Sequence, residues 1–112
     1  INIDGTYKVG AGGVLGIGNG ASLKVTSSGR IEIVGGVGGT ARVTNNASGG
    51  RYIFTIEGEI AADNYQFENM SESGIYLAPS STIDATYHFS NGIFSNGVNR
   101  GMLFRVENTQ SF

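Results

Sequence analysis

The chain has no cysteine, a single proline and few charged residues, and each shortage excludes a class of protein. Without thiols there is no disulfide framework, no thiolate zinc site and no cysteine nucleophile. Charged residues make up 14% of the 112 residues and the net charge is −2, so the basic cluster typical of nucleic-acid-binding proteins is missing. No apolar run approaches the roughly 18 to 20 residues of a membrane-spanning helix, so we expect no membrane insertion.

Glycine is abundant, at nineteen residues, and it follows no collagen-like period. Glycine disfavours helices, and the apolar residues are mostly β-branched or aromatic, which favours strands. The length suits one domain, residues 1–112, and the composition predicts that it is all-β. Because the chain begins at Ile1 without a methionine, we expect a processed product or a piece of a longer secreted protein.

Short runs in which every second residue is apolar recur along the chain, and each predicts a strand with one buried face. They are Ile1-x-Ile3, Tyr7-x-Val9, Leu15-x-Ile17, Leu23-x-Val25, Ile31-x-Ile33, Tyr65-x-Phe67, Ile75-x-Leu77, Tyr87-x-Phe89 and Met102-x-Phe104-x-Val106. Pairs such as Asn19-Gly20 and Ser28-Gly29 separate the runs and suit turns with positive φ. Three all-β folds fit: a sandwich, a barrel or a solenoid.

A weak internal repeat favours the solenoid. An apolar residue, any residue and then asparagine recur with asparagines at positions 19, 45, 69, 91 and 108. Two copies, residues 65–69 and 87–91, also share Tyr, Phe and Asn at a 22-residue offset. Repeats of this length are typical of solenoid coils. We predict a right-handed parallel β-helix of about five coils, on the order of 24 Å tall, with a β-sandwich as the alternative.

Stacked coils would bring equivalent side chains together. We predict an asparagine ladder of Asn45, Asn69 and Asn91, in which side-chain amides bond from coil to coil. The alternative is that each asparagine satisfies its own turn. We also predict one internal apolar stack, formed by Val25, Val43, Phe67, Phe89 and Val106.

Residues 20–36, which read GASLKVTSSGRIEIVGG, resemble β-helical segments of large secreted bacterial surface and adhesin-like proteins. Residues 64–70, 73–77 and 87–97 resemble the later coils of such proteins. The resemblance implies a secreted or surface-exposed rod used in adhesion or as a spacer. Some β-helices are instead polysaccharide lyases or hydrolases, but those are usually longer and carry a charged cluster on one face.

Catalytic residues are hard to find in the sequence. The sole histidine, His88, is expected to face solvent, and a general base needs a positioned partner. Glu57 and Glu59 are expected on the same face of one predicted strand, within range for calcium or for a glycosidase pair, although a solvated face is the stronger interpretation. Asn46 and Asn69 begin glycosylation sequons, which carry little weight in a chain rich in Asn and Ser. We therefore predict no enzyme, no metal and no cofactor.

The function predicted from these observations is structural. We expect a rigid rod, fibre or adhesin stalk at the cell surface, associating end to end with itself or with other domains of a longer parent, because neither end has a recognisable cap. The alternative is a carbohydrate-binding module or a fragment of a polysaccharide-active enzyme that binds a surface glycan. Its candidate stacking residues are Tyr52, Tyr65, Tyr76 and Tyr87.

Overall fold

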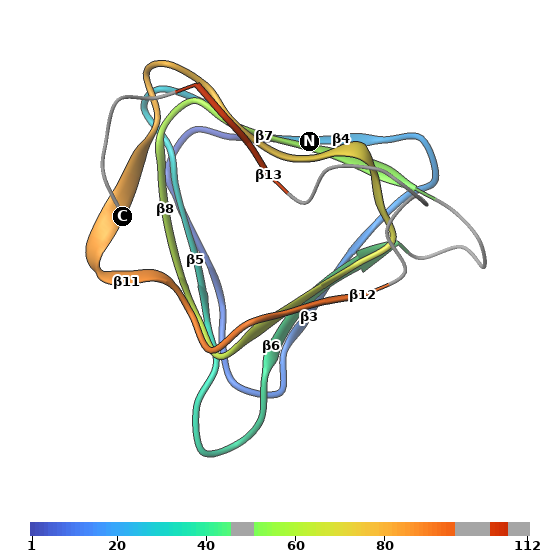
Figure 1. The fold of residues 1–112 in the computed structure, drawn as a ribbon, viewed down its shortest axis with the longest axis vertical. Helices are drawn as coiled ribbons and strands as arrows, with labels where there is room; N and C mark the ends of the chain where they lie inside the picture. Colours follow the sequence, from blue (N-terminus) through green and yellow to red (C-terminus); the bar gives the residue numbers. More distant parts are fainter. Residues whose placement is uncertain (46–50, 96–103, 108–112) are drawn as a thin grey trace.

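The computed structural model describes residues 1–45, 51–95 and 104–107, and all regular structure in these residues is β. The strands wind around one axis and form three parallel sheets, which enclose a triangular interior (Figure 1). All the ladders between these strands are parallel. The predicted all-β parallel solenoid is confirmed, and the sandwich alternative is excluded.

The three sheets are named here faces A, B and C, and the chain visits them in that order. Face A stacks β1 (Asn2–Ile3), β4 (Ser22–Val25), β7 (Tyr52–Ile56), β10 (Met70–Leu77) and β13 (Phe104–Val106). Face B stacks β2 (Thr6–Val9), β5 (Arg30–Val34), β8 (Glu59–Asp63) and β11 (Thr82–Ser90). Face C stacks β3 (Val14–Ile17), β6 (Ala41–Asn45), β9 (Tyr65–Glu68) and β12 (Ile93–Ser95).

The number of turns is smaller than the sequence predicted. Three full turns separate β1 from β10, and β11, β12 and β13 carry the winding into a fourth, so the estimate of about five coils is too high. The molecule measures 33 × 31 × 25 Å, and Figure 1 looks down its shortest dimension into the triangular coil. The molecule is therefore a squat prism, and its shortest dimension is close to the predicted height. The right hand of the coil stays a prediction.

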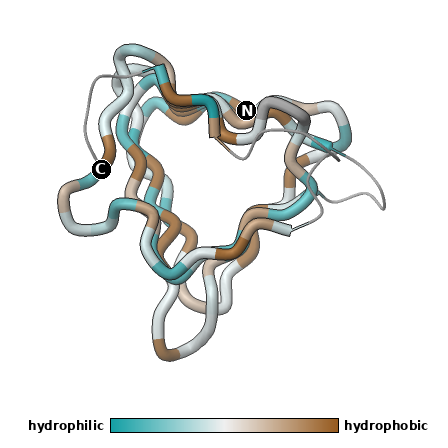
Figure 2. Tube along the Cα trace, in the orientation of Figure 1, coloured by the Kyte–Doolittle hydropathy of each residue, from teal (hydrophilic) through white to brown (hydrophobic). Residues whose placement is uncertain are grey.

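The core follows directly from the alternation of apolar and polar residues, which is visible along the faces in Figure 2. On face A, Leu23, Phe54 and Ile75 occupy one column of the parallel register, and all three are fully buried. On face B, Ile31, Ile60 and Ile83 form an equivalent column. Burying each such side chain contributes roughly 1.5 to 3 kcal/mol, so these internal columns are the main source of stability.

The corner between faces A and B is built from a column of small residues. Gly5, Gly29, Gly58 and Ser81 each precede a face-B strand directly, at equivalent positions in successive turns. A Cβ added at Gly29 would lie 2.0 Å from the carbonyl oxygen of Ile3, in the preceding turn. At Gly58 it would lie 2.2 Å from the carbonyl oxygen of Thr26. At Gly29 and Gly58, successive turns thus approach too closely for a side chain to fit between them.

The register of the repeat differs from the one predicted. Phe67 on β9 pairs with Phe94 on β12, whereas Phe89 lies on β11, in face B. The offset between aligned residues is also irregular: along the column Tyr7, Ile31, Ile60 and Ile83 it is 24, 29 and then 23 residues. Strand β7 is almost continuously apolar, yet it is buried on one side only, because Ile53 is 45% exposed.

We predict that Gly58→Ala destabilises the fold by about 2 to 3 kcal/mol, because the added methyl group would overlap backbone oxygens of the preceding turn. Urea denaturation followed by circular dichroism measures the change in the free energy of unfolding. Gly5→Ala is the matched control: it occupies the same column, but no atom lies within 4 Å of its added Cβ. A Gly58→Ala variant as stable as the Gly5→Ala variant would contradict this account of the corner.

Candidate functional site

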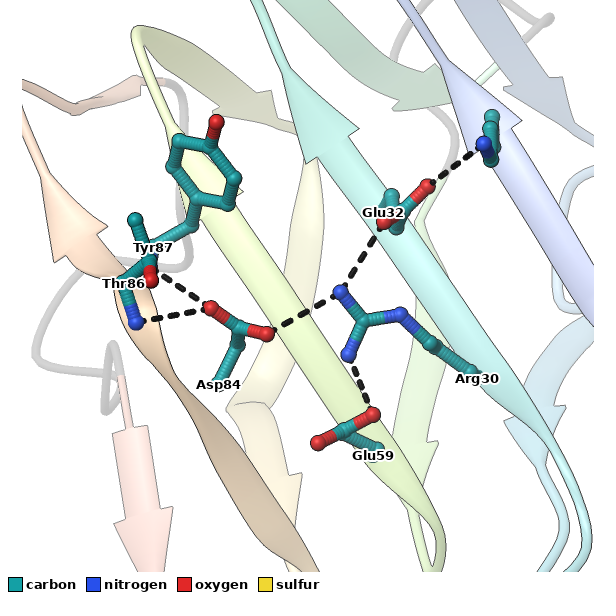
Figure 3. A network of polar contacts seen from close by, with 7 residues as sticks. Arg30, Glu32, Glu59, Asp84, Thr86 and Tyr87 are labelled. Atoms are coloured by element: carbon teal, nitrogen blue, oxygen red, sulfur yellow. Dashed lines mark hydrogen bonds and ion pairs between the residues drawn. The ribbon is translucent and has the colours of Figure 1, made fainter.

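The most extensive polar cluster described lies on the outer side of face B, around Arg30 (Figure 3). Nη2 of Arg30 donates to Glu32 Oε1 at 2.9 Å and to Asp84 Oδ2 at 3.1 Å, and Nη1 donates to Glu59. Lys8 Nζ reaches the other oxygen of Glu32, at 3.3 Å. The five side chains come from β2, β5, β8 and β11, so the cluster ties four successive turns together.

Two carboxylates in this cluster, those of Glu32 and Asp84, have pKa values below their usual range. The hydrogen bond from Arg30 is the main reason why the pKa of Glu32 is below its usual value, with Lys8 adding to the effect. The backbone N–H groups of Tyr87 and Thr86 donate to Asp84 Oδ1 at 2.9 and 2.8 Å, and they lower the pKa of Asp84 more than Arg30 does. In turn, the bond to Glu32 is the largest cause of the raised pKa of Arg30. Carboxylates so stabilised are poor proton donors near neutral pH.

Smaller ion pairs repeat this arrangement on the other faces. Arg42 on β6 donates twice to Glu68 on β9, with Nε to Oε1 at 2.9 Å. Lys24 on β4 lies 3.4 Å from Glu57, one turn further along. The expectation that Glu57 and Glu59 share a strand face is wrong, because Gly58 turns the corner between them and each acid pairs with a different cation.

The three asparagines of the predicted ladder bond to three different partners and not to one another. Asn45 Nδ2 donates to the carbonyl oxygen of Arg51, and Asn69 Nδ2 donates to Thr44 Oγ1. Asn91 lies at the other end of face C, where its Nδ2 donates to Asp63 Oδ1 at 2.9 Å. A continuous ladder of these three side chains is therefore wrong. Instead Asn64, Asn69 and Asn91 have φ values of 47°, 61° and 54°, a left-handed conformation that asparagine tolerates better than most residues.

The predicted single apolar stack is spread over all three faces. Val43 and Phe67 do pair in register on face C. Val25 lies on face A, where it is aligned with Ile56, and Val106 lies in the same face at the far end, where it is 42% exposed. Phe89, on face B, packs against the core with its ring 4.8 Å from that of Phe104. The interior thus contains several parallel columns, and the prediction combined two members of a face-A column, two of a face-C column and one residue of face B.

Two of the four candidate glycan-stacking tyrosines are core residues. Tyr52 is fully buried, and burial raises the pKa of its hydroxyl, which donates to the carbonyl oxygen of Val43. Tyr65 is 3% exposed and donates to the carbonyl oxygen of Phe89. Neither can present a ring to a sugar. The Tyr76 hydroxyl donates to Glu107 Oε1. The Arg105 guanidinium lies over the Tyr76 ring, with its carbon 5.2 Å from the ring centre. Glycan stacking stays a prediction for Tyr76 and Tyr87.

The chemistry-bearing residues of the sequence are dispersed in the structure. His88 is exposed on β11, as expected. Within residues 1–45, 51–95 and 104–107, no group of three or more His, Cys, Asp or Glu side chains is placed to hold a metal ion. The same residues contain no helix long and apolar enough to cross a bilayer. Asn46, one of the two sequon asparagines, lies outside the described part.

The two ends of the solenoid expose apolar side chains. Of the eight large apolar residues that are exposed in the described part of the chain, six belong to the first or the last turn. They are Ile1, Tyr7, Val14, Tyr87, Ile93 and Val106. The terminal strands of the sheets, β1, β2 and β3 at one end and β13, β11 and β12 at the other, lie in these turns. Most of the exposed large apolar side chains in the described residues thus lie in the first and last turns.

Comparison with known proteins adds no relative: no family model matches the chain, and no curated protein or solved structure is significantly similar to it.

We predict that Arg30→Met lowers the free energy of unfolding by about 1 to 2 kcal/mol at pH 7, because three carboxylates lose their shared cation. Since Glu32 and Asp84 have lowered pKa values when folded, their contribution is present at neutral pH and is lost as the pH falls below their ordinary values near 4. The difference between wild type and variant should therefore shrink between pH 5 and about pH 2 in urea titrations. An Arg105→Met variant, which alters an exposed pair, is the control, and a difference independent of pH would contradict the prediction.

We predict that Asn64→Ala destabilises the protein by about 1 kcal/mol relative to Asn64→Gly, because alanine is strained at a φ of 47° whereas glycine is not. Thermal and urea unfolding of the two variants measures the difference. The same pair of substitutions at Asn19, which is not among the residues with positive φ, is the control. Equal stability of the two Asn64 variants would show that the left-handed corner imposes no such strain.

Proposed function

We propose that this chain is a non-catalytic structural segment of an extracellular or cell-surface protein, serving as a rigid spacer in a stalk or fibre. The observation that carries the proposal is that the outward charges of Arg30, Arg42 and Lys24 all bind carboxylates of neighbouring turns. The outer surface is thus used to hold turns together, as the interior is.

Rigidity follows from the triangular cross-section. Parallel ladders run along all three faces, and the buried columns of each face pack against those of the others. Bending such a prism would require the ladders of one face to lengthen while those of another compress. Because interiors of proteins are close-packed and resist compression, a bend costs packing and hydrogen bonds together.

The absence of catalysis is supported by how the acidic groups are used. Glu32, Glu59, Glu68 and Asp84 each contact an arginine. A general acid needs a raised pKa and an accessible proton, whereas the pKa values of Glu32 and Asp84 are lowered. The surface location rests on the resemblance of residues 20–36 to secreted bacterial β-helices.

Antibody labelling of cells that produce the protein tests the location. We expect labelling of intact cells at the level seen after permeabilisation, and labelling that requires permeabilisation would overturn the surface assignment. The purified chain, incubated with a panel of polysaccharides, should release no reducing ends.

A glycan array separates the structural role from carbohydrate binding. We expect no reproducible binding by the wild-type chain. Binding that is abolished by Tyr87→Ala but kept by Tyr7→Ala would instead favour a carbohydrate-binding module, because both tyrosines are exposed but only Tyr87 was predicted to stack on a sugar.

A further inference from the structure

We propose that the corner loop of residues 35–40 is a proteolytic processing site. The bond between Val37 and Gly38 is cut by an endopeptidase whose primary pocket takes small aliphatic side chains, and the two fragments stay together as a folded complex. The proposal goes beyond the structural role and does not depend on where the protein is located. Three features support it: the loop is an insertion outside the sheets, its tip is accessible, and the turns on either side of the cut hold each other without it.

The loop is an insertion that the solenoid does not need. The end of β5 is aligned with the end of β8, and the start of β6 with the start of β9, but β8 and β9 are joined by the single residue Asn64. Gly35 N donates to the carbonyl oxygen of Asp63 at 2.9 Å. Ala41 N donates to the carbonyl oxygen of Asn64 at 3.0 Å. The chain therefore leaves the prism and returns to it at one corner, and residues 36–40 belong to none of the three sheets (Figure 1).

The tip of the loop is accessible. The side chain of Val37 is fully exposed, and the glycines next to it are exposed as well. Within the described residues, the only backbone hydrogen bonds internal to the loop are the two that join Gly36 and Gly39. A protease that binds its substrate in an extended conformation has to open this one pair, whereas cleavage within β5 or β6 requires several ladder bonds to open. Exposed loop tips of small residues are for this reason the preferred sites of proteolytic cleavage.

Val37 determines which class of protease fits. Serine endopeptidases recognise the side chain before the cleaved bond in a primary pocket, which is acidic in trypsin and small in elastase. Val37 is aliphatic and has two glycines on each side, so the primary pocket has only this side chain to recognise. Hydrolysis adds the hydroxyl group of water to the carbonyl carbon of Val37 and a hydrogen to the nitrogen of Gly38. The products are a carboxylate and an amine, and no other reactant is consumed.

The turns on either side of the cut are joined by non-covalent contacts on all three faces. Residues 1–37 contain β1 to β5, and residues 38–112 contain the remaining strands. Three parallel ladders cross between the fragments, one on each face: β4 with β7, β5 with β8 and β3 with β6. Arg30 in the first fragment also contacts Glu59 and Asp84 in the second. Because these contacts do not pass through the loop, cutting it leaves them in place.

Limited digestion of the folded, full-length chain with elastase tests the site, and mass spectrometry identifies the fragments. We expect fragments of residues 1–37 and 38–112, with cleavage after Val37 at least a hundredfold faster than after Val34 or Val43. Those two valines are matched controls, because they lie nearby in β5 and β6. A synthetic peptide of residues 31–45, which has no ladder, should be cut after all three. Absence of the cut after Val37 in the folded chain, or equal rates at the three valines, would overturn the processing site.

Two variants test what the protease recognises. Val37→Asp should slow the cut at least tenfold, because a charge does not suit a small apolar pocket, and a wild-type rate at this bond would overturn the assigned protease class. Deletion of residues 36–40 leaves Gly35 opposite Asn64 and should abolish the cut, while circular dichroism shows the same β structure. A deletion variant that does not fold would contradict the interpretation of the loop as an insertion.

The fragments of the cut chain test the second half of the proposal. In native buffer they should elute together from size exclusion, as the uncut chain does, and should separate only when urea is added. Arg30→Met should lower the urea concentration at which they separate, since Arg30 bonds across the cut. Arg42→Met is the matched control, because Arg42 and its partner Glu68 both lie in the fragment of residues 38–112. Fragments that separate in native buffer, or equal effects of the two substitutions, would overturn the proposed complex. Either failure leaves the structural role untouched, because antibody labelling tests that role separately.

Discussion

Hydrogen bonding along the axis is the constraint on which this structure depends. In a parallel solenoid the backbone N–H and C=O groups of each strand point toward the turns above and below, so no turn satisfies its own strands. The offset between aligned residues varies from 23 to 29 along one column, yet the alignment of inward residues is kept. The length varies at the corners, and the register also shifts within β10 and β11. Residues 35–40, which connect β5 to β6, project away from the prism and leave the ladders intact (Figure 1).

The charged side chains add a second, weaker set of contacts between turns along the same direction. Ion pairs at a partly exposed surface contribute little individually, and the buried columns contribute far more. The Arg30 cluster is more than an isolated pair, because one guanidinium serves three carboxylates from three turns. It also fixes which turn faces which, since a slip of one residue would turn Arg30 inward and Ile31 outward. The charges therefore help to specify the register that the apolar columns stabilise.

The sequence was sufficient for the architecture but not for the alignment of its turns. Alternating runs such as Leu23-x-Val25 and Ile31-x-Ile33 identified strands with the correct inward residues, because a period of two depends only on local geometry. The match between residues 65–69 and 87–91 misled the alignment, because corner lengths vary and Tyr-x-Phe-x-Asn suits either a face-B or a face-C strand. The outer ion pairs were missed, although Arg30-x-Glu32 alternates with buried isoleucines in the printed sequence. Gly29 was assigned to a turn with positive φ, whereas its actual constraint is the closeness of Ile3 one turn away.

The stability of each turn depends on the turns that lie on either side of it. An interior turn has its ladders satisfied on both sides and its core residues fully covered, as at Ile31 and Ile60. In the described residues, the first and last turns have such contacts on one side only, and their inward residues Tyr7 and Val106 are partly exposed. Each added turn contributes a new interface without adding a new end. The free energy that holds each turn in place therefore comes from its neighbours along the axis and not from the turn itself.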